Sequence, residues 1–152
     1  MDVFHDGNVI ARILLTLATI GYGIVTVKAD FNRTHATNPR WTPHARFHVV
    51  WQITRYVGFG LIAQALIWAP GPHAVGRLYL ACALAAVVYG AFFIALLAMP
   101  LYGGAAYDEN GYQPFTVRIG RPRLMDVNVS AFSVLSIMVL AAIVLIVRGP
   151  AI

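Results

Sequence analysis

The chain has 152 residues, of which 59% are hydrophobic and only 11% are charged, and its mean hydropathy is +0.71. A soluble domain of this size carries roughly 25% charged residues, so this chain lacks the polar surface that would keep a folded body in water. Despite a net charge of +5, the composition excludes an ordinary soluble enzyme, a disordered protein and a nucleic-acid-binding domain. It predicts an integral membrane protein in which residues 1–152 form a single domain within the lipid bilayer.

Four apolar segments are long enough to cross a bilayer, which takes about 20 residues. They cover residues 9–27, 43–68, 77–99 and 127–147. Thr42 and Pro43 are typical of a helix N-cap and first helical position, and Pro100 is expected to end the third segment. Because backbone polar groups in lipid need partners within their own segment, we expect an all-α fold, a bundle of four transmembrane helices.

Two long polar connections, residues 28–42 and 102–126, are expected on one membrane face, with the termini and the short connection 70–76 on the other. The basic residues of the long-loop face are Lys28, Arg33, Arg40, Arg46, Arg118, Arg121 and Arg123, and those of the opposite face are Arg12, Arg77 and Arg148. Cytoplasmic loops carry an excess of Lys and Arg. We therefore expect a plasma-membrane protein with cytoplasmic long loops and both termini outside.

The densest polar chemistry lies between residues 30 and 55, which include three of the five histidines. At about 100° per residue, one face of the second helix carries a polar stripe entering from the long-loop side, made of His44, His48, Gln52 and Arg55. Arg55 is expected about 16 Å beyond His44, inside the bundle, where ionisable groups are usually functional. Asp30 and Asp126 are expected at the same mouth, since they end the first segment and precede the fourth.

Three interpretations of this cluster stay open. The first is a metal site for zinc or iron, with the ligands His35, His44, His48 and Asp126. The second is a metal-free acid/base site, in which a histidine moves a proton on a lipophilic substrate. Its catalytic residues would be His44, His48, Asp30 and Arg55. The third is structural, with the polar groups tying the long loop to the helix ends. Haem is not expected, because His5 and His73 lie at the opposite face.

The segments ADFNRTH (29–35), NPRW (38–41) and PHARFH (43–48) carry a resemblance. They resemble the signature A-D-x-N-x-T-H, N-P-x-W and P-H-A-x-F-H of a family of small, uncharacterised integral membrane proteins of bacteria and fungi. The four-span layout resembles that family more loosely. The resemblance carries no reaction. It implies that one unit is formed by Asp30, Asn32, His35, Asn38, Trp41, His44 and His48.

The sequence thus favours a membrane enzyme that acts on a small hydrophobic or lipid-like substrate entering from the bilayer. The substrate-binding residues would be Asn32, Asn38, Trp41, Trp51 and Gln52. The alternative is a non-enzymatic accessory subunit or small carrier of a larger membrane complex, with a purely structural cluster. Because four short spans bury limited surface against one another, a homo-oligomer or a larger complex is expected in either case.

Overall fold

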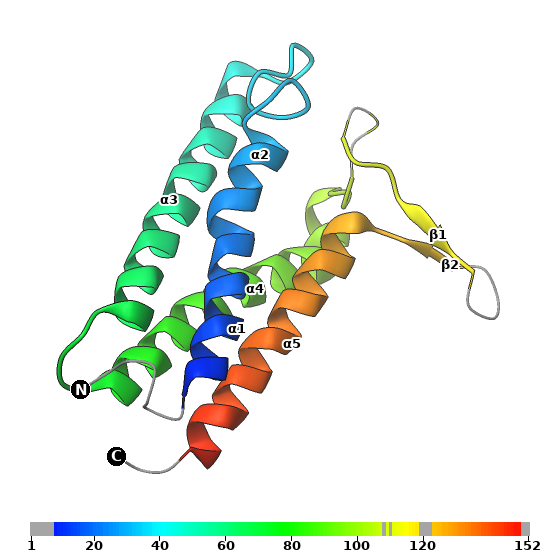
Figure 1. Ribbon diagram of the computed structural model, residues 1–152. Helices are drawn as coiled ribbons and strands as arrows, with labels where there is room; N and C mark the ends of the chain where they lie inside the picture. The colour runs from blue at the N-terminus through cyan, green and yellow to red at the C-terminus, as the bar shows by residue number, and fades with distance from the viewer. Residues whose placement is uncertain (1–7, 108, 110, 119–122, 150–152) are drawn as a thin grey trace.

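The computed structural model describes residues 8–107, 109, 111–118 and 123–149. The elements follow one another as α1 (Val9–Ile20), the π-helical turn η1 (Gly21–Val25), α2 (Thr26–Asp30), α3 (Pro43–Trp68), α4 (Ala74–Tyr102), β1 (Phe115–Val117), β2 (Arg123–Met125) and α5 (Val127–Arg148). The first three form one continuous helix, Val9–Asp30. Figure 1 shows the long helices packed side by side, with the two strands projecting from one end.

Within the described part of the chain, three helices are long and apolar enough to cross a membrane, namely Val9–Asp30, Ala74–Tyr102 and Val127–Arg148. The sequence predicted four such segments, and α3 is the one that does not meet this description. Its 26 residues are long enough. However, polar side chains such as Gln52, Arg55 and Gln64 are spread along the helix and lower its hydropathy. A fourth crossing therefore does not follow from length and composition.

The predicted helix ends are correct at α3 and wrong at α4. The side chain of Thr42 caps α3 by accepting a hydrogen bond from the N–H of Ala45, and a proline occupies the first turn. The third segment does not end at Pro100, because α4 continues to Tyr102. It ends at Gly103, whose φ of 65° is left-handed. Proline lacks a backbone N–H, so Pro100 removes one hydrogen bond in the last turn without ending the helix. Gly103 adopts the left-handed conformation that closes it.

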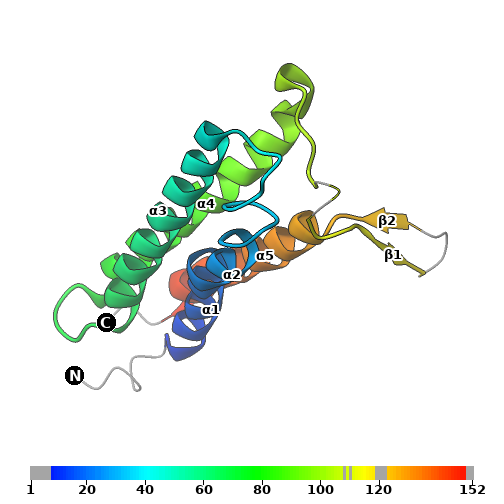
Figure 2. The same cartoon turned by 90° about the horizontal axis from the view of Figure 1, so that it is seen from above.

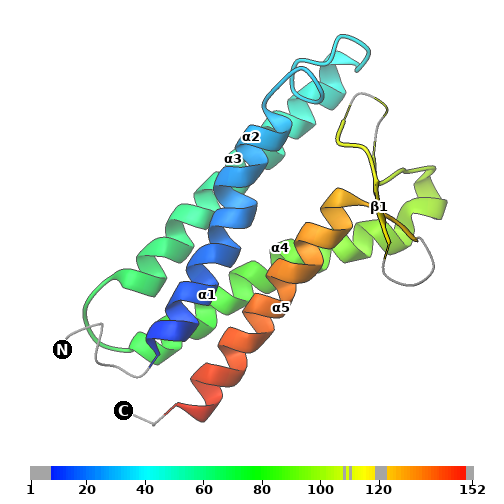
Figure 3. The same cartoon turned by 45° about the vertical axis from the view of Figure 1, so that its right-hand side comes forward.

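The helices enclose an apolar core. The N-terminal helix packs against α5 through α1 and against α3 through η1, and α4 packs against both α3 and α5. Leu15, Tyr22, Leu78 and Ala142 are fully buried at these contacts. The start of α1, the turn between α3 and α4, and the end of α5 lie at one end of the molecule, and the loop 31–42 lies at the other (Figures 1 and 3).

A β-hairpin was not predicted. Strands β1 and β2 pair antiparallel, with Thr116 opposite Leu124, within the connection expected to be a plain loop. The fold is mostly helical, as predicted, and the hairpin is a small addition to it. Figure 2 shows the hairpin pointing away from α3. Three-residue strands give too short an alternation of polar and apolar positions to be distinguished from a loop in the sequence.

Candidate functional site

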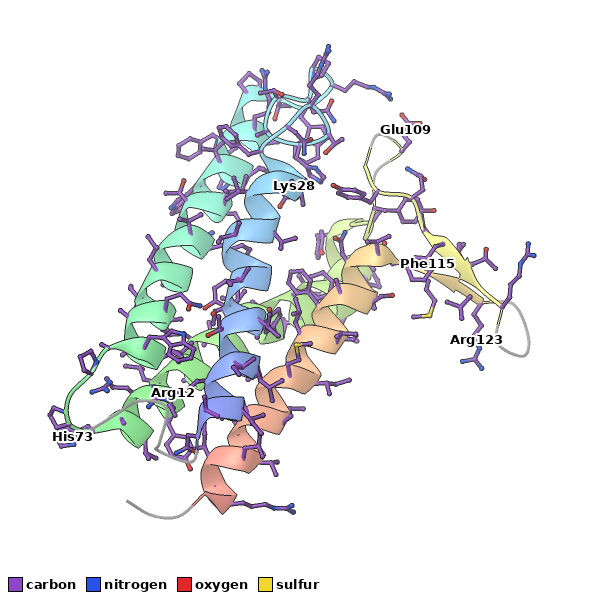
Figure 4. The ribbon with its side chains drawn as sticks, viewed as in Figure 1. Arg12, Lys28, His73, Glu109, Phe115 and Arg123 are labelled. Carbon is purple, nitrogen blue, oxygen red and sulfur yellow. The ribbon has the colours of Figure 1, made fainter. Side chains whose placement is uncertain are left out.

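A cavity of about 580 Å³ opens between the helices near the loop end of the molecule. It is lined by Gly21, Val25, Thr26, Lys28, Ala29, Asp30, His35, Trp41, Val49, Gln52, Tyr56, Phe92, Tyr112, Val127, Asn128, Ala131, Phe132 and Leu135. The volume falls within the range of small-molecule sites, about 300–1,000 Å³. Asp30, His35, Trp41 and Gln52, which were predicted as site residues, line this cavity. Figure 4 places Lys28 at the same end of the molecule, opposite the end that holds Arg12 and His73.

The polar end of the cavity contains a histidine beside a carboxylate. The Nδ1 atom of His35 lies 3.9 Å from Oδ1 of Asp30, and both side chains are about three-quarters buried, with 26% and 23% exposed. The N–H of Ala36 donates to the carbonyl oxygen of Asp30 at 3.0 Å, which folds the loop back over the end of α2. The ring of Trp41 meets the His35 ring edge to face at 5.2 Å. Chain reversal therefore brings the His35 imidazole and the Asp30 carboxylate to one wall of the cavity.

Hydrogen bonds around Thr34 indicate which nitrogen of His35 carries the proton. The Thr34 hydroxyl lies 2.6 Å from Oδ1 of Asn32 and 2.7 Å from Nδ1 of His35. The amide oxygen of Asn32 can only accept, so the single hydroxyl proton points to it. Nδ1 of His35 must then donate to Thr34, which leaves Nε2 as the basic nitrogen of the neutral ring.

Asn32 and Asn38 shape the loop that presents His35. The Asn32 amide donates to the carbonyl oxygens of Lys28 and Ala29 at 2.9 and 2.8 Å, at the C-terminal end of α2. The Asn38 side chain is 2% exposed, donates to the carbonyl oxygen of Thr34 and accepts from the N–H of Arg40. These contacts give both asparagines a structural role, and neither lines the cavity. Their predicted contact with a substrate stays a prediction.

His44 and His48 lie together but on the outside of α3. Their Nε2 atoms are 3.0 Å apart and both side chains are exposed. Neither residue lines the cavity. The predicted spacing of one helical turn is correct, while the predicted position inside the bundle mouth is wrong. The helix instead turns Val49, Gln52 and Tyr56 toward the cavity.

Arg55 and Trp51 continue this outer face. The guanidinium carbon of Arg55 lies 4.7 Å from the centre of the Trp51 ring, a cation–π contact. Both side chains are exposed. Arg55 was predicted to hold a substrate group deep in the bundle, and the structure directs it outward. On a helical wheel, Arg55 lies within about 20° of His48, on the outer face. Gln52 lies about 40° from His48 in the opposite direction, toward the cavity.

The predicted metal ligands are not assembled. Among the described residues, no group of three or more His, Cys, Asp or Glu side chains could hold a metal ion. Asp126 caps α5 by accepting from the N–H of Val129 at 2.9 Å. His35 faces the cavity, while His44 and His48 face outward. The loop that separates these histidines reverses the chain, so that proximity in sequence does not become a shared coordination site.

Several cavity residues were not predicted, including Tyr56, Phe92, Tyr112, Asn128 and Phe132. Tyr56 follows Gln52 by one helical turn, and this spacing is a signal that could have identified it. Asn128 is a polar residue at the start of an apolar run. The π-helical turn η1 also lines the cavity, through Gly21 and Val25. Such wide turns occur frequently at functional sites.

Comparison with known proteins gives one family assignment. A family model described as "Family of unknown function (DUF6640)" matches residues 14–142. This range covers the cavity, the loop 31–42 and the hairpin. No curated protein and no solved structure matches the chain. The chain belongs to DUF6640, a family of unknown function.

Proposed function

We propose that this protein is a membrane enzyme that acts on a small hydrophobic or lipid-like substrate by acid/base chemistry. The observation that supports this function best is the partly buried Asp30–His35 pair on the wall of a cavity of about 580 Å³. The cavity is mostly apolar, and its few polar groups converge near one end. That combination is typical of sites for small lipophilic molecules.

In this proposal, Nε2 of His35 removes or delivers a proton on the substrate. Asp30 would orient the ring and face the positive charge that develops on it during proton transfer, since its Oδ1 lies 3.9 Å from Nδ1 of His35. Gln52 and Asn128 also line the cavity and would orient an oxygen of the substrate. The acid/base role thus moves from His44 and His48, which the sequence favoured, to the histidine that lines the cavity. The metal-assisted version has less support, because no three of its four ligands meet at one place.

We further propose that α3 crosses the bilayer as a fourth span beside the three apolar helices. It contacts all three parts of the N-terminal helix and also packs against α4, so it is expected to share their environment. The loop 31–42 and the turn between α3 and α4 would then lie on opposite sides of the membrane. The excess of Lys and Arg on the long-loop side supports a plasma-membrane orientation with the long loops in the cytoplasm.

The enzyme proposal is tested with the purified protein in lipid nanodiscs incubated with a lipid extract of its host cells. Mass spectrometry would follow consumed and formed lipids. Wild-type protein should convert at least one lipid. His35→Ala should lower the rate by about 100-fold, the lower range for general acid–base catalysis. His44→Ala is the matched control and should retain the rate, because it removes an exposed histidine. No conversion by the wild type, or equal conversion by His35→Ala, would contradict the proposal.

An accessory subunit is the second candidate, and one observation favours it. Phe47 is 60% exposed and Trp51 is 49% exposed on the outer face of α3, where they contact one another and His48. Exposed aromatic residues beside Arg55 are typical of a protein interface. Native mass spectrometry of the protein from mild detergent should then detect a bound subunit that Phe47→Ala/Trp51→Ala releases. A monomer in both samples would count against this role.

A further inference from the structure

We infer that the cavity accepts a planar aromatic ring system that carries a hydroxyl group. This inference deepens the proposed function and rests on it, because it names the class of substrate for the same cavity. It depends on the distribution of aromatic and polar side chains along the cavity wall.

Aromatic side chains reach the cavity from five separate segments of the chain, as Trp41, Tyr56, Phe92, Tyr112 and Phe132. They come from the loop 31–42, from α3, from α4, from the connection before β1 and from α5. Phe92 and Phe132 stack on one another with centroids 4.2 Å apart and an angle of 30° between the ring planes. Aromatic pairs gain interaction energy beyond the burial of apolar area. Such a wall favours a flat ring over a flexible alkyl chain.

The depth of the cavity sets the size of the ring system. Gly21 and Asp30 both line it. Nine residues separate them on one continuous helix, so they differ by about 13 Å in depth at 1.5 Å per residue. Two or three fused rings fit this length and a volume of about 580 Å³. Gly21 also closes the deep end, because a Cβ there would meet Cδ1 of Leu135 at 2.5 Å.

The polar groups require an oxygen at one end of the ligand. Asp30 and His35 lie at the shallow end, while Phe132 and Leu135 lie one and two turns along α5 from Asn128. A carboxylate accepts and does not donate when ionised. A hydroxyl group on the ring can donate to Asp30 or to Nε2 of His35, which an ether or a hydrocarbon cannot do. Toward the deep end, Gly21, Phe92 and Leu135 carry no hydrogen-bonding side chain, and the hydroxyl of Tyr56 is the polar group that α3 contributes there.

The inference is tested by photocrosslinking with 4-hydroxybenzophenone, an aromatic phenol that is itself photoreactive. The wild-type protein in nanodiscs would be irradiated with the probe, and labelled peptides would be mapped by mass spectrometry. We expect labelling of peptides that contain Trp41, Tyr56 or Phe132. We also expect 2-naphthol to suppress it and 1-decanol to leave it unchanged. Peptides around Leu97 and Leu101, which are 81% and 89% exposed, report labelling from the bilayer.

Phe132→Leu removes one ring and keeps an apolar side chain. The concentration of 2-naphthol needed to suppress labelling should rise by about fivefold, which corresponds to the interaction energy of one aromatic pair. Phe93→Leu is the matched control, since Phe93 neighbours Phe92 but does not line the cavity. Equal competition by 1-decanol would overturn the aromatic class while leaving a cavity for lipophilic substrates. Labelling at Leu97 and Leu101 alone, without competition, would overturn both the ligand class and the proposed site.

Discussion

The hydroxyl group of Tyr89 on α4 donates a hydrogen bond to the carbonyl oxygen of Ala18 on α1 at 2.5 Å. This carbonyl precedes the π-helical turn η1, where the regular backbone hydrogen-bond pattern of the helix is interrupted. The Ala18 carbonyl also accepts from the backbone N–H of Gly21, so the Tyr89 hydroxyl is a second donor to it, supplied by a neighbouring helix. Tyr89 therefore ties α4 to the wide turn that lines the cavity.

Tyr89→Phe should destabilise the protein by about 1 kcal/mol, within the range for hydrogen bonds between membrane helices. The substitution removes the donor to Ala18 and leaves the ring in place. Tyr22→Phe is the matched comparison, because Tyr22 is also buried but its hydroxyl has no hydrogen-bond partner among the described residues. The loss of the Tyr22 hydroxyl should leave the stability of the protein unchanged or raise it. Unfolding in mixed detergent and SDS, followed by circular dichroism, measures both variants. Equal stability of the two would refute the role of the Tyr89 bond.

Gly21→Ala should destabilise the protein by about 1–3 kcal/mol, the usual cost of overpacking a core. The added methyl group would meet Cδ1 of Leu135 at 2.5 Å and the hydroxyl of Tyr89 at 3.2 Å. Gly90→Ala is the control, since a Cβ there meets nothing within 4 Å and should raise helix stability slightly.

The same unfolding assay provides a second check on the contact at Gly21. The double variant Gly21→Ala/Leu135→Ala should lose less stability than the sum of the two single variants, because Leu135→Ala removes the atom that the new methyl group meets. Additive losses in the double variant would show that this contact does not limit the packing of η1 against α5.

The helical segments could be predicted from the sequence because apolar runs longer than about 18 residues are a strong signal. The predicted limits of the second segment, 43–68, coincide with α3, since a capping threonine and a proline mark its start. The π-helical turn could not be predicted, because its residues also fit a regular helix. The hairpin depends on pairing between β1 and β2 across a connection, which a single short strand does not encode.

The candidate site was predicted in part. Asp30 and His35 lie in one segment and meet because the loop folds back on α2, as the grouping of polar residues suggested. The stripe on α3 was misplaced because a helical wheel gives relative angles but not the direction of the core. His48 and Arg55 were grouped with Gln52, although on the helical wheel they lie about 40° and about 60° from Gln52, on the outer face of the helix. Cavity residues from α4 and α5 depend on tertiary packing and had no local signal.

Asn32→Asp should disorder the loop that presents His35. The Asn32 amide donates to the carbonyl oxygens of Lys28 and Ala29. A carboxylate removes both donors and places a negative charge at the negative end of the helix. Hydrogen exchange of the amides of Ala36 and Asn38, which donate to the carbonyl oxygens of Asp30 and His35, should accelerate by about tenfold or more, as expected for the loss of roughly 1.5 kcal/mol of local stability.

Thr37→Ala is the control for the loop, because Thr37 is exposed and its side chain makes no hydrogen bond among those the structure describes. Its exchange pattern should match the wild type. Asn32→Asp should also lose lipid conversion in the nanodisc assay, since His35 is then no longer held beside Asp30. Retained conversion with accelerated exchange would mean that the position of His35 does not matter to the reaction.

Cysteine labelling on intact cells tests whether α3 crosses the membrane. The native Cys82 is buried, and Cys82→Ala provides a background free of thiols. Arg33→Cys and His73→Cys place exposed thiols before and after α3. If α3 spans the bilayer with the long loops in the cytoplasm, a membrane-impermeant maleimide should label the cysteine at 73 on intact cells and the one at 33 only after permeabilisation. Labelling of both positions from the same side would show that α3 does not cross, and the reverse pattern would invert the orientation inferred from the basic residues.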